Sequence, residues 1–267
     1  EPPDSLYSWR KNTMSNPTPV LVSFIHSGRE EVLLRSLTAA FAQQYPEFSV
    51  SVVDCSASDR LENTLKTRFP RLLYNKNETA AGIASSRNFA MKQYLSREYG
   101  FIFLLDDDIQ LEKDCLSALV AAMNEDPSIS LAVPLILNED GTVLSAGGIY
   151  YRLFGQPWLI REANSPQRNL DFASGAIGLY RKEAIAAVGP FDTDFDPYGF
   201  EDIDYGLRLN ARGYRIRLVD KALCRHLTAY SFHQEQGFFL YHTTKHRLFC
   251  AYKHLCLFAF LFASLPW

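Results

Sequence analysis

Three consecutive aspartates are the residues best suited to chemistry in this chain. Asp106, Asp107 and Asp108 follow the apolar run 101–105, which is short and rich in β-branched and aromatic residues. Such a run is predicted to be a buried strand, and strands of open α/β sheets bind ligands at their carboxyl ends. Because alternate residues of a strand face opposite ways, we expect Asp106 and Asp108 to share a face while Asp107 turns away.

Carboxylate oxygens at this spacing suit Mg²⁺ or Mn²⁺, especially when substrate phosphates complete the coordination shell. The alternative is a solvated acidic turn that caps the next predicted helix, residues 111–123, because carboxylates favour the amino end of a helix. The residues alone leave both alternatives open.

A second acidic group begins another predicted helix. Glu201, Asp202 and Asp204 follow an aromatic and acidic loop over residues 191–200. Carboxylates in a first helical turn interact favourably with the helix dipole, which is a purely structural role. At the entrance to a sugar site, one of them could instead act as a general base.

Composition places the chain among ordinary globular proteins and narrows its partners. Of 267 residues, 47% are hydrophobic and 21% are charged, and the net charge is −3. No strong positive field attracts nucleic acid, so no nucleic-acid partner is expected. The five cysteines are odd in number and show no CxxC spacing. They indicate reduced cysteines of a cytoplasmic protein.

Strand-like and helix-like segments alternate in the first half of the chain. The predicted strands there are 20–25, 48–53, 72–74 and 101–105, and the predicted helices are 29–43, 61–69 and 80–94. This alternation favours an α/β fold with a mostly parallel sheet covered on both faces. In the second half we expect strands over 131–137, 142–151, 172–180 and 214–219, a loop over 156–171 and a short helix over 183–188.

Several motifs occur in an order that is typical of one enzyme family. They are the helix start 29–34 with Gln43, the strand end 52–59 with Asp54, Asn75 with 82–88, the aspartates at 106–108, Gly175-Ala176, 189–192, and Glu201-Asp202 with Arg208. Over about residues 19–233 the chain resembles the family 2 glycosyltransferases, which are inverting nucleotide-sugar enzymes with the GT-A fold. The resemblance implies that fold, a Rossmann-like central sheet flanked by helices with a C-terminal helical extension.

The resemblance also implies roles around the aspartates. Asp108 would ligate a divalent cation, Mn²⁺ or Mg²⁺, that bridges the donor diphosphate. Asp106 would help position the ribose and the metal, with Asp107 supporting. His226 matches a histidine that often serves as a further metal ligand in such enzymes, although a lone histidine is as readily structural.

Other site residues follow from the same resemblance. Asp202 would be the general base, with Glu201 as the second choice. Asp54 would accept a hydrogen bond from the nucleotide base, with Arg87 beside it or on a helix surface. Gly175 would lie at the nucleotide-sugar site.

Two departures concern the nucleotide base and the aromatic residues. His26 and Ser27 stand where many relatives carry a Thr-Tyr-Asn-like triplet, so they would grip the base differently. Tyr198, Phe200 and Tyr205 would stack on sugar faces or pack in the core.

The implied partners are a UDP- or dTDP-sugar donor and a glycan or lipid-linked glycan acceptor. A catalytically silent relative that binds a nucleotide sugar or a partner is the alternative. A phosphatase-type Asp-x-Asp nucleophile site is disfavoured, because that motif normally lies on the first strand.

We expect three regions along the chain. Residues 1–18 would be a tail, 19–235 a GT-A catalytic domain with halves 19–110 and 111–235, and 236–267 a C-terminal helical segment. The chain begins with Glu1 and shows no signal peptide, which indicates a piece of a longer protein. Residues 255–267 carry no charge but are too few to span a bilayer. With the basic stretch before them, they would lie on a membrane surface, at the inner face of the plasma membrane, or form a core helix.

Overall fold

A computed structural model describes residues 17–57, 60–79, 82–162, 169–227 and 236–263. Most of the predicted tail, 1–18, therefore lies outside the described residues. The strands of the central sheet are β1 (Val20–His26), β2 (Phe48–Asp54), β3 (Leu73–Lys76), β4 (Phe101–Asp106), β5 (Ile109–Leu111), β6 (Ile129–Leu137), β7 (Val143–Ser145), β10 (Gly178–Arg181) and β11 (Arg215–His226). A separate hairpin contains β8 (Gly148–Tyr151) and β9 (Gln156–Leu159).

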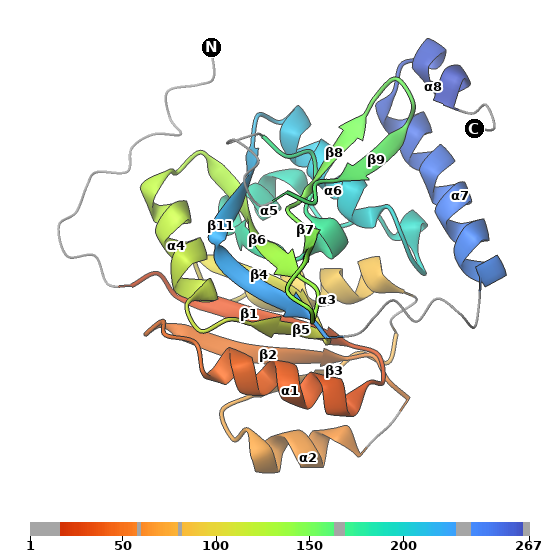
Figure 1. Cartoon of the computed structure of the whole chain (residues 1–267). Coiled ribbons are helices and arrows are strands. Elements are labelled where there is room, and N and C mark those ends of the chain that lie inside the picture. The colour runs from red at the N-terminus through yellow and green to blue at the C-terminus, as the bar shows by residue number, and fades with distance from the viewer. Residues whose placement is uncertain (1–16, 58–59, 80–81, 163–168, 228–235, 264–267) are drawn as a thin grey trace.

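Helices surround this sheet (Figure 1). They are α1 (Glu30–Phe41), α2 (Leu61–Arg68), α3 (Ile83–Leu95), α4 (Cys115–Glu125), α5 (Lys182–Val188), α6 (Glu201–Ala211), α7 (Gln236–His254) and α8 (Leu257–Ala263). Two 3₁₀ turns lie at Ser174–Ala176 and Thr193–Phe195. None of the helices within the described residues is long and apolar enough to cross a membrane.

The strand order is β3-β2-β1-β4-β10-β6-β11-β5, with β7 on β6. Pairing is parallel from β3 to β4, as the strand–helix alternation predicts. It becomes mixed beyond β4, because β10 runs antiparallel to both β4 and β6. The α/β fold class is confirmed, and parallel pairing returns between β6 and β11.

Both faces of the sheet are buried, and successive side chains of β1 point alternately into the two cores. Val20, Val22 and Phe24 pack in one core with residues of α1, α2 and α4. Leu21 and Ile25 pack in the other core with residues of α3, α5 and α6. Near-continuous apolar strands are required because each face of the sheet meets helices.

The helix predicted over 111–123 begins later than expected. Residues Ile109–Leu111 form strand β5, which pairs antiparallel with β11 from Leu111 to Cys224 and from Ile109 to His226. The helix that follows, α4, begins at Cys115. The aspartate triplet therefore does not cap it, and the capped-turn alternative is wrong.

Three expectations for the second half of the chain need correction. The strand predicted over 142–151 is divided into β7 and β8, because Gly147 adopts a φ of +84° and redirects the chain to the second sheet. The strand predicted over 172–180 is confined to β10, since the 3₁₀ turn at Ser174–Ala176 interrupts it. The loop predicted over 156–171 contains β9, and residues 163–168 lie outside the described residues.

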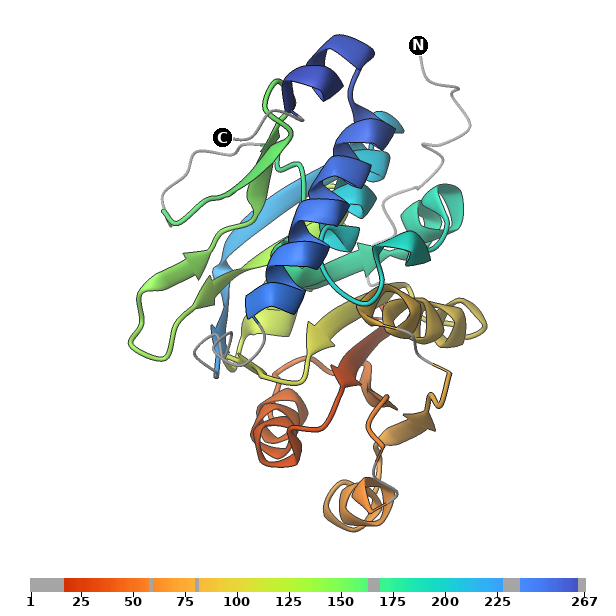
Figure 2. The same cartoon turned by 90° about the vertical axis from the view of Figure 1, so that its right-hand side faces the viewer.

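A third apolar cluster attaches the C-terminal helix α7 to the rest of the fold. Cys250 of α7 packs with Phe195, Ile203 and Leu207 in this cluster. Figure 2 shows α7, in blue, running beside α6, in cyan. The carboxyl ends of β1 and β4, the start of α6 and one side of α7 thereby approach a common space.

Candidate active site

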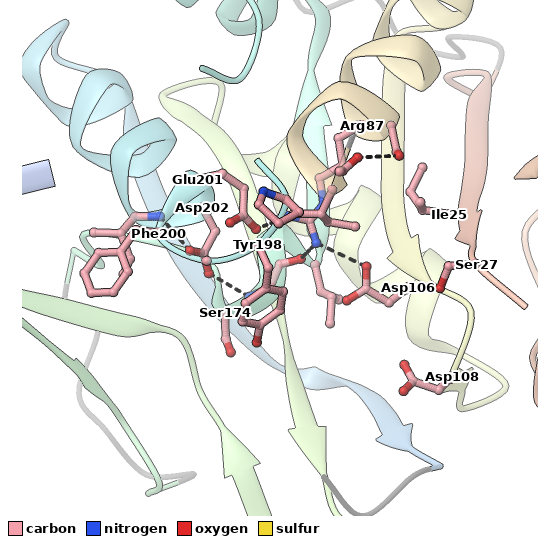
Figure 3. Close-up of a pocket in the computed structure, with 18 of the residues that line it drawn as sticks. Ile25, Ser27, Arg87, Asp106, Asp108, Ser174, Tyr198, Phe200, Glu201 and Asp202 are labelled. Carbon is pink, nitrogen blue, oxygen red and sulfur yellow. Dashed lines mark hydrogen bonds and ion pairs between the residues drawn. The ribbon is translucent and has the colours of Figure 1, made fainter. Parts of the chain in front are cut away.

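A cavity of about 940 Å³ lies at the carboxyl ends of β1 and β4. Its walls come from the first turns of α3 and α6, the 3₁₀ turn at Ser174–Ala176, strand β9, the end of β11, and α7. Open α/β sheets bind ligands at this edge, outside the carboxyl ends of the strands. Figure 3 shows that Asp106 and Asp202 point into this space from opposite walls.

One buried arginine connects the two acidic groups. Arg87 is 2% exposed, and its Nη2 donates to Asp106 Oδ1 at 3.1 Å and to the Gly175 carbonyl at 2.6 Å. Its Nη1 donates to Glu201 Oε1 (Figure 3). Burial alone would lower the pKa of Arg87, but the carboxylates of Asp106 and Glu201 raise it. The guanidinium therefore stays charged and fixes both carboxylates, so Arg87 is not a helix-surface residue.

Asp202 is a carboxylate whose pKa is raised toward neutral pH. Its Oδ2 accepts the Gly175 N–H at 2.8 Å and its Oδ1 accepts the Ile203 N–H at 2.8 Å. Burial and the neighbouring charge of Glu201 raise the pKa of Asp202 to about 7, although Arg87 and the two backbone hydrogen bonds oppose the shift. A carboxylate with this pKa can accept a proton near neutral pH.

The backbone before α6 aims these carboxylates at the cavity. Gly199 and Phe200 have φ values of 93° and 72°. A positive φ is unusual for a phenylalanine and costs about 1–2 kcal/mol. The left-handed residue starts the helix so that Glu201 and Asp202 both line the cavity. Glu201 Oε2 is buried and has no hydrogen-bond partner among the described residues, so it can accept a ligand hydroxyl.

The other two aspartates form a separate polar chain. Asp107 Oδ2 lies 2.9 Å from His26 Nδ1, and Asp107 Oδ1 accepts from Arg29 Nη2. Asp108 Oδ2 accepts from Arg29 Nη1 at 2.6 Å and lies 3.4 Å from His226 Nε2. Asp106 and Asp108 both line the cavity, as expected, but so does Asp107, which strand alternation predicts to turn away; β4 ends at Asp106, so the alternation does not extend to Asp107.

The donor set at Asp108 fits a divalent cation only in part. Two cis ligands of an octahedral Mg²⁺ or Mn²⁺ with bonds near 2.1 Å lie about 3 Å apart. The 3.4 Å between Asp108 Oδ2 and His226 Nε2 is close to that spacing. Among the described residues, however, no three His, Cys, Asp or Glu side chains are arranged to hold a metal. Such an ion would need further ligands from a substrate, as a diphosphate would provide.

His26 and Asp54 lie behind the cavity wall. Asp54 is fully buried and accepts hydrogen bonds from the Ser56 N–H, the Tyr74 hydroxyl and Lys76. Burial alone would raise the pKa of Asp54, but these hydrogen bonds lower it. His26 is engaged with Asp107. Neither side chain lines the cavity, whereas Ser27 does.

The aromatic residues near α6 divide between cavity and core. Tyr198 and Phe200 line the cavity. Tyr205 is buried and stacks on Phe191 with ring centroids 4.2 Å apart, so its role is packing. His246 of α7 holds the loop in place, since its Nδ1 lies 2.8 Å from the Tyr198 carbonyl oxygen.

Sequence reasoning missed several residues that the structure brings to the site. Arg29 lines the cavity, as do Phe239 and Thr243 from α7. A catalytic domain that ended at residue 235 would leave out these last two. The position of Arg29, a charged residue just after the first strand, could have indicated a site residue. Its pairing with Asp107 and Asp108 could not be predicted, because they are far away in the sequence.

The amino end of α3 is occupied by another missed residue. Asp196 accepts hydrogen bonds from the N–H groups of Ala84 at 2.8 Å and Ser85 at 3.3 Å. A Cβ on Gly82 would lie 2.4 Å from Pro197 Cα, so this close approach requires glycine. The helix end that could bind a phosphate is therefore capped from within the protein.

Sequence comparison identifies relatives with a matching segment. The sequence model of the family described as "Glycosyl transferase family 2" matches residues 20–189. Poly-beta-1,6-N-acetyl-D-glucosamine synthase of Staphylococcus aureus (strain COL) is 25% identical over 200 residues, 73% of this chain and 46% of that protein. The enzyme of the same name from Staphylococcus epidermidis is 24% identical over 205 residues, with the same coverages of 73% and 46%. The chain spans about half the length of these curated relatives.

Solved structures share the fold. GalNAc-T7 with UDP, GalNAc and Mn²⁺ superposes with a TM-score of 0.66 at 15% identity, covering 80% of this chain and 44% of that one. S. aureus TarS superposes with a TM-score of 0.59 at 21% identity, covering 79% and 37%. The predicted GT-A fold is confirmed.

Proposed function

The chain belongs to glycosyl transferase family 2, and from this premise we propose that it transfers a sugar from a nucleoside-diphosphate donor to a hydroxyl of a glycan acceptor with inversion. The observation that carries the proposal is one cavity in which Asp202 faces Asp106 and Arg87 connects the two groups. The arrangement provides a proton acceptor on one wall and a place for a diphosphate on the other.

Asp202 is the proposed base. Its carboxylate would remove the proton of the acceptor hydroxyl as the oxygen attacks the anomeric carbon on the face opposite the leaving diphosphate. The pKa of about 7 lets Asp202 ionise near neutral pH and still bind a proton firmly enough to drive the step. The Gly175 N–H holds the carboxylate in position. Glu201, with one oxygen on Arg87, would orient a sugar hydroxyl through the other.

The donor diphosphate would lie at the aspartate end of the cavity. Asp108 and His226, with Asp106 nearby, would hold Mn²⁺ or Mg²⁺ together with the phosphate oxygens. A bound cation supplies Lewis-acid stabilisation of the negative charge that develops on the leaving phosphate. Ser27 lies on the same wall, where it would contact the nucleotide.

The acceptor is proposed to be a glycan, free or lipid-linked, and the donor a UDP- or dTDP-sugar. The relatives named as polysaccharide synthases support a glycan acceptor. Tyr198 and Phe200 give the cavity aromatic faces against which sugar rings can stack.

We also propose that α8 touches a membrane surface at the inner face of the plasma membrane. Leu257 and Phe258 are each 73% exposed, and Leu261 is 58% exposed, on a helix without charged residues. An exposed apolar helix after a basic segment fits the interface of an anionic bilayer. Sedimentation with vesicles of anionic phospholipid should recover the protein. The double variant Leu257→Ser/Phe258→Ser should stay in the supernatant, and equal recovery of both proteins would remove this contact.

A donor screen tests the proposed function. Thermal shifts with UDP- and dTDP-sugars, with and without Mn²⁺, should identify a donor that stabilises the protein only with metal. With that donor, Asp202→Asn should keep binding and lose at least about 100-fold in turnover. The control is Asp194→Asn, on an exposed carboxylate outside the cavity.

The same screen distinguishes a glycosyltransferase from the alternative, a relative that binds a nucleotide sugar without transferring it. Metal-dependent donor binding with no transfer or hydrolysis against a broad panel of glycan acceptors would indicate the silent, binding-only relative. Unchanged turnover in Asp202→Asn would instead remove Asp202 as the base.

A further inference from the structure

Arg29 places a permanent positive charge beside the proposed cation site. It precedes α1 directly, and its side chain is 44% exposed where it lines the cavity. Its two terminal nitrogens divide between two carboxylates, Nη2 on Asp107 and Nη1 on Asp108 at 2.6 Å. Those carboxylates are 1% and 2% exposed. Buried carboxylates need such a charge, because an unpaired ion is costly away from water.

The guanidinium and a divalent cation would compete for one atom. Asp108 Oδ2 accepts the hydrogen bond from Arg29 and is also the oxygen that lies 3.4 Å from His226 Nε2. A cation held by this oxygen and His226 would stand within a few ångströms of the guanidinium. Like charges at that separation repel strongly in a partly desolvated site. The guanidinium and the cation therefore cannot both contact Asp108 Oδ2 with favourable geometry.

We infer that Arg29 is an exchangeable counter-cation for Asp107 and Asp108, displaced when a divalent cation and a donor diphosphate bind together. The inference rests on the proposed function and extends it to Arg29, a residue to which the family resemblance gives no role. The exposed side chain has room to turn, and a guanidinium binds phosphate oxygens with two parallel hydrogen bonds. After displacement, Arg29 would pair with the donor diphosphate that lies in the same cavity.

This exchange makes metal binding depend on the nucleotide. Without a diphosphate, the cation must displace Arg29 with no new partner for the guanidinium, so its affinity is weak. With a diphosphate, the displaced guanidinium gains phosphate contacts, so the affinity rises. By linkage the metal must tighten nucleotide binding by the same factor.

Mn²⁺ binding measured by electron paramagnetic resonance tests the exchange without any turnover. The proteins are the wild type, Arg29→Gln, Arg29→Lys and the control Arg35→Gln, each with and without UDP or dTDP. Arg35 lies in α1, the helix that Arg29 precedes, and its side chain is 56% exposed and lies 3.6 Å from Glu139. Its variant removes an equal charge from α1 without touching the aspartates.

Arg29→Gln should bind Mn²⁺ alone about tenfold more tightly than the wild type, and the nucleotide should strengthen that binding less. Arg29→Lys keeps the charge without the fork, so its affinity should lie between the two. It also serves as the folded variant if circular dichroism shows that Arg29→Gln is unfolded. Arg35→Gln should match the wild type.

Mn²⁺ affinity that is equal in the wild type and both Arg29 variants would overturn the inference and leave the proposed transfer untouched. A lack of Mn²⁺ binding in all proteins, with and without nucleotide, would overturn it as well. Failure of the proposed function would appear separately, as absent turnover with the donor found in the screen.

Discussion

The backbone N–H of Gly175 donates a hydrogen bond of 2.8 Å to the carboxylate of Asp202. The same glycine gives its carbonyl to Arg87 at 2.6 Å. One residue of the 3₁₀ turn therefore positions both the proposed base and the guanidinium that holds Glu201 and Asp106. The turn therefore links the two walls of the cavity.

Turnover should depend on pH through Asp202. Burial and Glu201 raise the pKa of Asp202 from 3.8 to about 7. The base works only when ionised, so kcat should fall about tenfold per pH unit below that value and level off above it. Initial rates at saturating donor and metal from pH 5 to 9 measure this.

Glu201→Gln tests whether the charge of Glu201 raises the pKa of Asp202. It removes the neighbouring negative charge, so the midpoint of the pH profile should move to lower pH. A profile that is flat from pH 5 to 9 in the wild type would show that Asp202 titrates as an ordinary aspartate or is not the base.

Arg87→Gln should reduce both stability and turnover. It leaves the buried carboxylate of Glu201 without its partner, and breaking such a pair costs about 3–5 kcal/mol. Loss of the fixed geometry should lower kcat by about 100-fold even where the variant is folded. Urea unfolding and single-donor kinetics measure the two effects.

Arg181→Gln controls for the loss of a half-buried guanidinium. Arg181 donates to the carbonyl oxygens of Ile129 and Met123, outside the cavity. This variant should also lose stability but retain kcat in the folded fraction. Equal kinetic losses in both variants would mean that Arg87 acts only through folding.

Asp108→Asn and His226→Gln should weaken Mn²⁺ binding in the presence of UDP. Each removes one proposed ligand, and we expect the affinity to fall by at least about tenfold, with the larger effect at Asp108. Isothermal titration calorimetry gives the constants. The control is Glu112→Gln, which removes a carboxylate directly after β5 that pairs with Arg225 of β11 at 2.8 Å. A ligand variant that keeps wild-type affinity is not part of the metal site.

Asp204→Asn should destabilise the attachment of α7. Burial alone would raise the pKa of Asp204, but hydrogen bonds from His254 and Lys253 and the charge of Arg208 lower it to about 2. A folded-state pKa below the usual 3.8 contributes stability above that pH and loses it as pH falls toward 2. The shift corresponds to about 2 kcal/mol at neutral pH.

Urea unfolding at pH 7 and at pH 3 measures this contribution. Asp204→Asn should be less stable than the wild type at pH 7, and the difference should shrink to about half at pH 3, because folded Asp204 is still mostly ionised there. Asp194→Asn, on an exposed aspartate, should match the wild type at both. The same difference at the two pH values would assign the effect to packing rather than charge.

Local pattern was enough for the first half of the fold. The runs of β1, β2 and β4 are mostly apolar because the sheet is covered on both faces, and their short length distinguished them from helices. The second half was harder because several of its strands pair antiparallel over short lengths, and many pair with partners distant in the sequence. Residues Ile109–Leu111 are a strand only because β11 lies beside them.

The sequence by itself determined which carboxylates could do chemistry, because aspartates at a strand end and at a helix start have positions that local structure dictates. It also determined the family, through the order of its motifs. Only the tertiary structure decided which side chains pair with these carboxylates. Arg87 pairs with Glu201, 114 residues away in the sequence, and Arg29 pairs with Asp108, 79 residues away. Charge pairing at such separations depends on how the strands and helices pack, which no local pattern contains.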